Sequence, residues 1–165
     1  MIGLAIARAL HVLGVVIWIG GVALATLVLF PAIRQGAFAE RGAAVFHAIE
    51  RRFVWFARAS VLLVGASGLY MVQELDAWDR FRSAEFWWMH AMVGTWLIFA
   101  LLLFVGEPLI LHRYGEDLIA RRPRFAYAVL HAVHAILLIL ALITIAGAVL
   151  GSHGVSFASF APPRP

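Results

Sequence analysis

The sequence contains no cysteine and no lysine, and only 13% of its 165 residues are charged. Without thiols the chain cannot form disulfides, thiolate metal sites or iron–sulfur clusters, and it cannot attach a c-type haem covalently. The charged fraction is about half of what a soluble domain carries. With 64% hydrophobic residues and a mean hydropathy of +0.93, the composition excludes a soluble fold and indicates an integral membrane protein.

Four apolar stretches follow one another along the chain, at about residues 2–33, 53–72, 85–111 and 125–150. Each is long enough to cross a bilayer, since a spanning helix needs about 20 apolar residues. The sequence therefore predicts an all-α fold: an integral membrane four-helix up-down bundle, forming a single domain over residues 1–154 with an irregular tail at 155–165. A segment of mixed apolar and charged residues, Phe38–Arg52, predicts an amphipathic helix before the second span.

All thirteen basic residues are arginine, and their distribution predicts the orientation of the bundle. The first and third connections hold Arg34, Arg41, Arg51, Arg52, Arg113, Arg121, Arg122 and Arg124. Cytoplasmic loops are enriched in basic residues, so both odd connections are expected in the cytoplasm and both termini outside. Arginine in so apolar a chain points to lipid headgroups rather than to nucleic acid. Trp78, Trp87 and Trp88 predict an outer aromatic belt, with Trp55 near the inner one.

Seven histidines are the strongest nitrogen ligands available, and the spans sort them by depth. His11 and His90 are expected about 9–13 Å outside the bilayer midplane. Because the first and third helices of an up-down bundle are usually diagonal, these two rings can face each other across the core. Two axial imidazoles of one haem require that geometry. The alternative is that both histidines are neutral polar groups that form hydrogen bonds between helices.

Spacing adds detail to this outer site. Five residues of the first span recur at intervals of three and four and so share one helix face: Arg8, His11, Gly14, Trp18 and Gly21. The two glycines are expected to leave room for a large planar group, and Arg8 can pair with a haem propionate. Gly94, one turn from the third-span histidine, offers similar clearance. The alternative role of these glycines is close helix packing.

A second polar set is expected in the inner half of the membrane. His131 and His134 lie three residues apart, with Glu107 and Arg58 at comparable depth. Two imidazoles and a carboxylate can bind a divalent metal, and either histidine can ligate a second haem. Alternatively, Arg58 and Glu107 neutralise each other, which avoids a lone charge in lipid. The remaining histidines are expected to have ordinary interfacial roles: His47, His112 and His153.

Three segments carry a likeness to a known family. Ala9–Gly21 places a histidine seven residues before a tryptophan that is followed by glycine, Trp87–Met92 contains a Trp-x-His pattern, and Val64–Tyr70 is rich in glycine. Together they resemble three of the four spans of the CopD/HemJ superfamily of small bacterial integral membrane proteins. The closing segment, Ala148–Gly154, resembles a branch distinct from the two members that give the superfamily its name. His11 and His90 match the family's histidine positions.

The resemblance implies a four-helix protein that handles haem or copper. HemJ-type proteins bind haem b and oxidise protoporphyrinogen, whereas CopD-type proteins are linked to copper uptake. HemJ-type proteins have a lysine two residues after the third-span histidine, and Met92 at this position argues against protoporphyrinogen oxidation. CopD-type proteins commonly carry methionine-rich outer segments, whereas the four methionines here are scattered, although Met89 and Met92 flank His90.

The resulting hypothesis is a b-type haem-binding protein that transfers electrons in the bacterial inner membrane, with several spans and both termini periplasmic. The expected cofactor-binding residues are His11 and His90 as ligands of the haem iron, with Arg8, Gly14, Trp18 and Gly94 around them. His131, His134 and Glu107 form the candidate second metal or haem site. The expected partners are the lipid bilayer and a quinone or respiratory complex, in a homo- or hetero-oligomer. A copper-handling transporter, a protoporphyrinogen oxidase and a structural subunit of a membrane complex remain as alternatives.

Overall fold

The computed structural model describes residues 1–35, 42–115 and 121–155, with the side chains of 42–47, 50 and 110–115 left out. Apart from short turns, these residues are helical and include no strand. Four helical stretches are long and apolar enough to cross a membrane: Ile2–Arg34, Arg51–Glu74, Ala84–Leu109 and Pro123–Ser152. The predicted all-α four-helix membrane bundle is therefore confirmed. The tail at 156–165 lies outside the described residues.

Each span is built from one or more helical segments. The first consists of α1 (Ile2–Leu24), the π-helix η1 (Ala25–Leu29) and α2 (Phe30–Arg34). The second is α3 (Gly42–Glu74), and the short 3-10 helix η3 (Trp78–Arg82) follows it. The third consists of the 3-10 turn η4 (Ala84–Phe86), α4 (Trp87–Leu101) and the π-helix η5 (Leu102–Gly115). The fourth is α6 (Pro123–Ser152).

The expected amphipathic segment and the second span form one helix. From Gly42 onwards α3 runs without a break to Glu74, so the amphipathic residues from Gly42 to Arg52 extend the span on its N-terminal side. Residues 38–41 of that prediction lie outside the described part of the chain. A continuous helix fixes the rotation of the amphipathic part relative to the membrane-spanning part.

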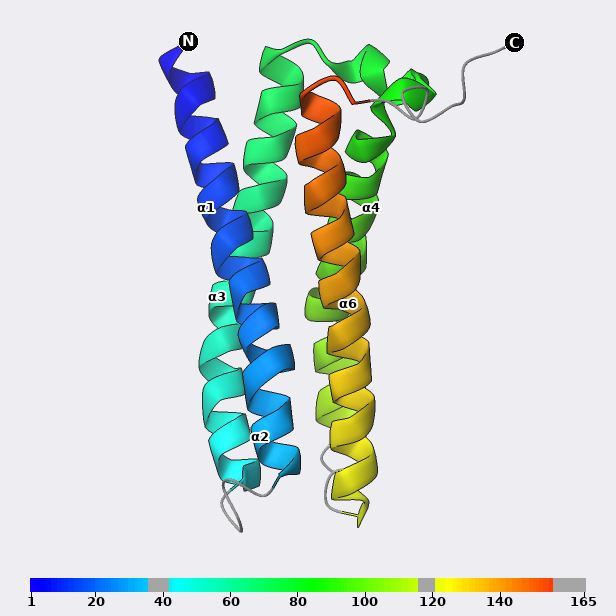
Figure 1. The fold of residues 1–165 in the computed structure, drawn as a ribbon. Helices are drawn as coiled ribbons and strands as arrows, with labels where there is room; N and C mark the ends of the chain where they lie inside the picture. The colour runs from blue at the N-terminus through cyan, green and yellow to red at the C-terminus, as the bar shows by residue number, and fades with distance from the viewer. Residues whose placement is uncertain (36–41, 116–120, 156–165) are drawn as a thin grey trace, which may run out of the picture.

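Two antiparallel hairpins make up the bundle (Figure 1). The first pairs α1 with α3 and the second pairs α4 with α6, while smaller contacts join α1 to α6 and α3 to α4. This ring of neighbours makes α1 and α4 the diagonal pair, as expected for the first and third spans. Met1 and the end of α6 lie at the same end of the bundle, hereafter the terminal end.

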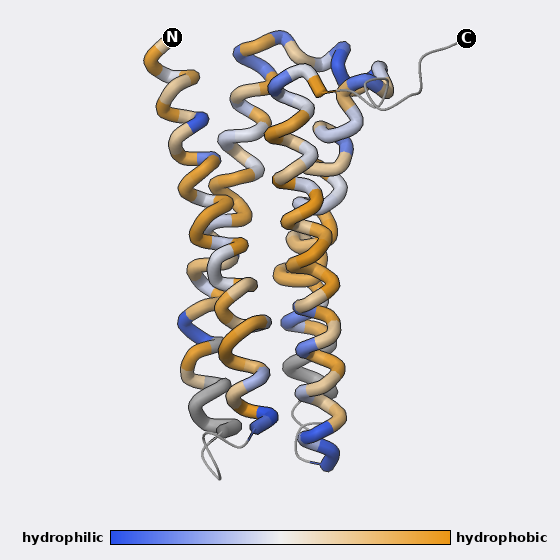
Figure 2. The backbone as a smooth tube through the Cα atoms, in the orientation of Figure 1, coloured by the Kyte–Doolittle hydropathy of each residue, from blue (hydrophilic) through white to orange (hydrophobic). Residues whose placement is uncertain are grey.

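Hydropathy divides the bundle along its length (Figure 2). Apolar residues fill the middle, and hydrophilic residues gather at both ends: in η3 and η4 beside the termini, and where α2 ends and α6 begins, at the end opposite the termini. We call this the arginine-rich end, because it carries Arg34, Arg51, Arg52, Arg121, Arg122 and Arg124. Many large apolar side chains are exposed, including Leu27 at 67% and Ile136 at 65%. Such a surface is suited to lipid rather than to water.

The buried core lies between the hairpins and draws on all four spans. Its members are Trp18, Ile19, Val22, Val61, Val64, Phe99, Leu138 and Ala141. The Trp18 ring meets the Phe99 ring edge to face, with centroids 4.7 Å apart. Nearer the terminal end, the Thr95 and Thr144 hydroxyls form a buried hydrogen bond of 2.9 Å between α4 and α6. Interhelical hydroxyl bonds of this kind stabilise helix pairs within a membrane.

Two spans change from α- to π-helix close to a proline. In the first, η1 ends just before Pro31, and in the third, Pro108 lies within η5. Proline has no N–H, so it breaks the regular hydrogen-bond ladder and the helix adjusts locally. Around Pro108 the third span is a π-helix rather than an α-helix.

Candidate functional site

His11, in the half of α1 nearer the terminal end, is bound to α3. Its Nδ1 atom lies 3.1 Å from the Val64 carbonyl oxygen and 3.1 Å from the Ser67 hydroxyl oxygen. The carbonyl can only accept a hydrogen bond, and the Ser67 hydroxyl donates its own proton to the Leu63 carbonyl at 2.6 Å. Both partners therefore require the proton on Nδ1, which leaves a lone pair on Nε2. A histidine that ligates a metal through Nε2 needs this tautomer.

The glycines on the His11 face of α1 serve helix packing. A Cβ atom at Gly14 would lie 2.8 Å from a methyl carbon of Val64, and one at Gly21 would overlap the Phe53 ring. The space that we expected for a planar cofactor at these positions is thus filled by side chains of α3. Trp18 is only 5% exposed and belongs to the core. Arg8, one turn towards the terminal end, is exposed.

His90 is exposed and is held by the turn that precedes its own helix. Its Nε2 atom donates to the Phe81 carbonyl oxygen at 2.9 Å, and its ring meets the Phe81 ring edge to face at 5.5 Å. A Cβ atom at Gly94 would meet nothing within 4 Å, so the clearance predicted there exists. That clearance is on α4, however, and is not shared with His11.

The structure does not bring His11 and His90 together, although their helices are diagonal as expected. One ring is turned towards α3 and the other towards η3. A haem held by both rings does not fit this placement. His11 alone does fit an axial ligand, because its ring is fixed through Nδ1 and its Nε2 lone pair is uncommitted.

Arg58 and Glu107 form the ion pair that was one of the two alternatives for the inner polar set. The Arg58 Nη2 and Glu107 Oε2 atoms are 2.6 Å apart, and the two side chains are 24% and 18% exposed. The guanidinium also lies 5.6 Å from the Trp55 ring and 5.9 Å from the Phe104 ring. These contacts neutralise and shield a charge within the span.

Arg58 also covers a backbone group that Pro108 leaves open. In a π-helix the Leu103 carbonyl would accept from the N–H five residues later, and that residue is Pro108, which has none. Arg58 Nη2 lies 3.5 Å from the Leu103 carbonyl oxygen. This is a weak hydrogen bond, and it meets the need of a membrane protein to satisfy exposed backbone groups.

His131 and His134 pack around Phe30 near the arginine-rich end. The Phe30 ring stacks on His131 at 5.8 Å and meets His134 edge to face at 4.9 Å. Arg34 Nη1 donates to His131 Nδ1 at 3.2 Å, so the neutral His131 ring carries its own proton on Nε2. His134 Nδ1 donates to the Leu130 carbonyl at 2.9 Å and leaves Nε2 free.

The candidate metal site of His131, His134 and Glu107 is not assembled. Glu107 pairs with α3, whereas the two histidines contact α2. No group of three histidine, aspartate or glutamate side chains that could hold a metal occurs in the described part of the chain. Of these three residues, only His134 combines a hydrogen-bonded Nδ1 with an Nε2 lone pair that could ligate a metal.

The other histidines divide between described and undescribed parts. His153 is exposed after the end of α6, where its Nδ1 donates to the Val149 carbonyl at 2.8 Å, in keeping with an interfacial position. The side chains of His47 and His112 are outside the described residues.

Sequence reasoning missed the partners of the histidines. Ser67 lies in a stretch of small residues, Gly65–Gly68, and such a stretch signals close approach of another helix. It could have pointed to α3 as the neighbour of His11. The contacts of Phe30 and Arg34 with α6 join positions about 100 residues apart, and no local pattern signals them.

Comparisons of the chain with protein-family models, with curated proteins and with solved structures give no match.

Proposed function

We propose that the protein binds b-type haem through His11 and takes part in electron transfer in the bacterial inner membrane, with both termini periplasmic. The observation that carries the proposal is the orientation of His11. Its Nδ1 is held by two acceptors on α3 and its Nε2 is uncommitted, within a span. Hydrogen bonds to the far nitrogen orient a metal-ligating histidine and raise its basicity.

In this proposal a bound haem supplies one-electron redox chemistry. The chain's own contribution is to fix the ring that ligates it and to surround it with apolar helices, both of which set the potential. Arg8 is exposed one turn nearer the terminal end, and its guanidinium suits a propionate at the membrane surface. A quinone or a respiratory complex is the proposed electron partner. His134, with the same tautomer, is the candidate ligand of a second haem.

The copper alternative has less support from the geometry. A copper site needs its soft ligands to converge. Met89 is 6% exposed and points into the bundle, whereas His90, the next residue, is exposed and bonded to Phe81. Arg34 places a positive charge on the remaining histidine cluster, and that charge opposes cation binding.

A structural role is the second candidate, because the hydrogen bonds of His11 also join α1 to α3. An absorption spectrum of the protein purified from cells supplied with haem separates the two. We expect the Soret and visible bands of a reducible, high-spin haem with one imidazole ligand, and His11→Ala should abolish them. His153→Ala is the matched control and should keep the wild-type spectrum. A colourless wild type that is folded would refute haem binding and leave the structural role.

His90→Ala, measured in the same way, tests the expected pairing of the two histidines. Since His90 is held by Phe81, we expect the spectrum of this variant to remain that of the wild type. A low-spin wild-type spectrum that His90→Ala converts to high-spin would show that the ring leaves Phe81 to become the second axial ligand.

A further inference from the structure

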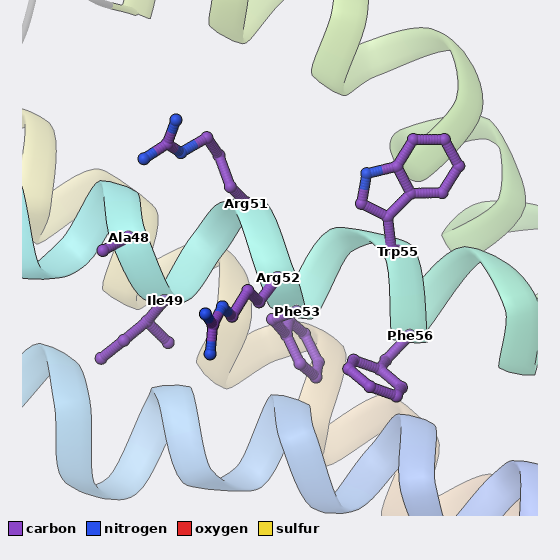
Figure 3. Close-up of a pocket in the computed structure, with 7 residues that line it drawn as sticks. All are labelled: Ala48, Ile49, Arg51, Arg52, Phe53, Trp55 and Phe56. Atoms are coloured by element: carbon purple, nitrogen blue, oxygen red, sulfur yellow. The ribbon is translucent and has the colours of Figure 1, made fainter.

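A groove of about 1040 Å³ lies on α3 at the arginine-rich end (Figure 3). Its lining consists of Ala48, Ile49, Arg51, Arg52, Phe53, Trp55 and Phe56. Cationic and aromatic side chains thus line the same groove, with Arg51 and Trp55 on one side of α3 and Arg52 and Phe56 on the other, at the place where α3 enters its membrane-spanning part. None of these residues has a role in the proposed function.

The arginine and aromatic side chains of the lining lie at different levels along the axis of α3. In Figure 3 the Arg51 and Arg52 side chains extend towards the Ala48 end of the segment, away from the middle of the span. Trp55 and Phe56 leave the helix further along, and they are 71% and 64% exposed. Arginine near a helix end extends in this way to bring its charge to the headgroup layer, while exposed aromatic rings remain beside the acyl chains.

Both guanidinium groups are available to an anion. Within the described part of the chain, neither Arg51 nor Arg52 takes part in a hydrogen bond or an ion pair, and both are exposed. Arg58, two turns further into the membrane, is already neutralised by Glu107. The free positive charge of this surface is therefore confined to the level of the headgroups.

We propose that this groove binds an anionic phospholipid, with its phosphate held by Arg51 and Arg52 and an acyl chain lying along Trp55 and Phe56. Guanidinium groups bind phosphate oxygens through paired hydrogen bonds, and anionic lipids are attracted to basic segments at the ends of spans. A zwitterionic lipid carries a cationic group that these two arginines disfavour. This site is independent of haem binding.

Native mass spectrometry of the full-length protein in detergent tests the site. The probes are phosphatidylglycerol and phosphatidylcholine with identical acyl chains. We expect one phosphatidylglycerol to be retained per chain in preference to phosphatidylcholine. The double variant Arg51→Gln/Arg52→Gln should weaken that binding about thirtyfold, since each arginine near a membrane surface contributes on the order of 1 kcal/mol.

The matched control is Arg121→Gln/Arg122→Gln, which removes the same charge from the same end of the bundle. We expect this variant to bind phosphatidylglycerol as the wild type does. Equal losses in the two double variants would overturn the proposal in favour of a general charge effect. Equal retention of the two lipids by the wild type, or retention of neither, would also overturn it, and this comparison does not depend on any variant folding.

Discussion

Arg58 shows how a single residue can meet several requirements of an apolar environment. It neutralises Glu107, lies against two aromatic rings and covers the Leu103 carbonyl. Its Nε atom is nevertheless buried without a hydrogen-bond partner. The guanidinium is thus placed for its ion pair with Glu107, even though its Nε–H forms no hydrogen bond. The pair is the main reason that both charges are tolerated within the span.

A double-mutant cycle tests this pairing. Arg58→Met removes the ion pair of a carboxylate within the span, and we expect it to lower the free energy of unfolding by about 3 kcal/mol, the low end for buried pairs, since both side chains are partly exposed. Arg58→Met/Glu107→Gln should cost less than the single change. Reversible unfolding in mixed detergent micelles measures both variants.

The control for this cycle is the pair Arg82–Asp79, whose side chains are 87% and 90% exposed. Because water screens so exposed a pair, the corresponding neutral substitutions should leave stability unchanged. If the single Arg58 change and the double change cost the same, the two residues are not coupled.

At the scale of the helical element, the third span is organised around Pro108. Pro108 supplies no N–H five residues after Leu103, and the Arg58 guanidinium lies 3.5 Å from that carbonyl oxygen, so we expect the irregular helix and the ion pair to be coupled. Functional sites in membrane helices commonly occur where the backbone departs from the α-helix. Here that departure positions a carboxylate and supplies its cationic partner with an additional acceptor.

Pro108→Ala tests this dependence. The alanine N–H restores a backbone donor for the third span, so the Leu103 carbonyl no longer needs Arg58. We therefore expect Arg58→Met to cost about 1 kcal/mol less in the Pro108→Ala background than in the wild type, which is the value of one hydrogen bond. The same unfolding measurement gives the comparison, and an unchanged cost would show that the carbonyl contact contributes nothing.

At this scale the sequence predicts well those features to which many residues contribute, such as the membrane spans. The spans follow from hydropathy summed over about 20 positions. The cost of an isolated charge in lipid made the Arg58–Glu107 pair one of the alternatives for the inner polar set, and the structure shows that pair. The rotation of each helix about its own axis depends on tertiary packing instead. Gly14 against Val64 turns His11 towards α3, and the turn containing Phe81 captures His90.

At the scale of the whole molecule, the uneven distribution of arginine gives the bundle a polarity. Because basic residues are retained in the cytoplasm, the arginine-rich end should face the cytoplasm and the terminal end the periplasm. This orientation would put the proposed phospholipid site in the cytoplasmic leaflet and His11 in the periplasmic half of the membrane.

Reporter fusions test the orientation directly. Alkaline phosphatase is active in the periplasm, so fusions near Trp78 and at the C-terminus should be active. Fusions after Arg52 and after Arg122 should be inactive. The opposite pattern would reverse the bundle in the membrane and would move both proposed sites to the other leaflet.

The pairing of α1 with α3 and of α4 with α6 bears on how the chain is made. Each pair joins spans that are consecutive in the sequence, so the largest contact areas form between segments that leave the ribosome one after the other. The first hairpin can complete its packing, including the hydrogen bonds of His11 with α3, before the third span has been synthesised. Biogenesis would then proceed hairpin by hairpin, and the His11 ring would be held in its final orientation from the earliest stage of assembly.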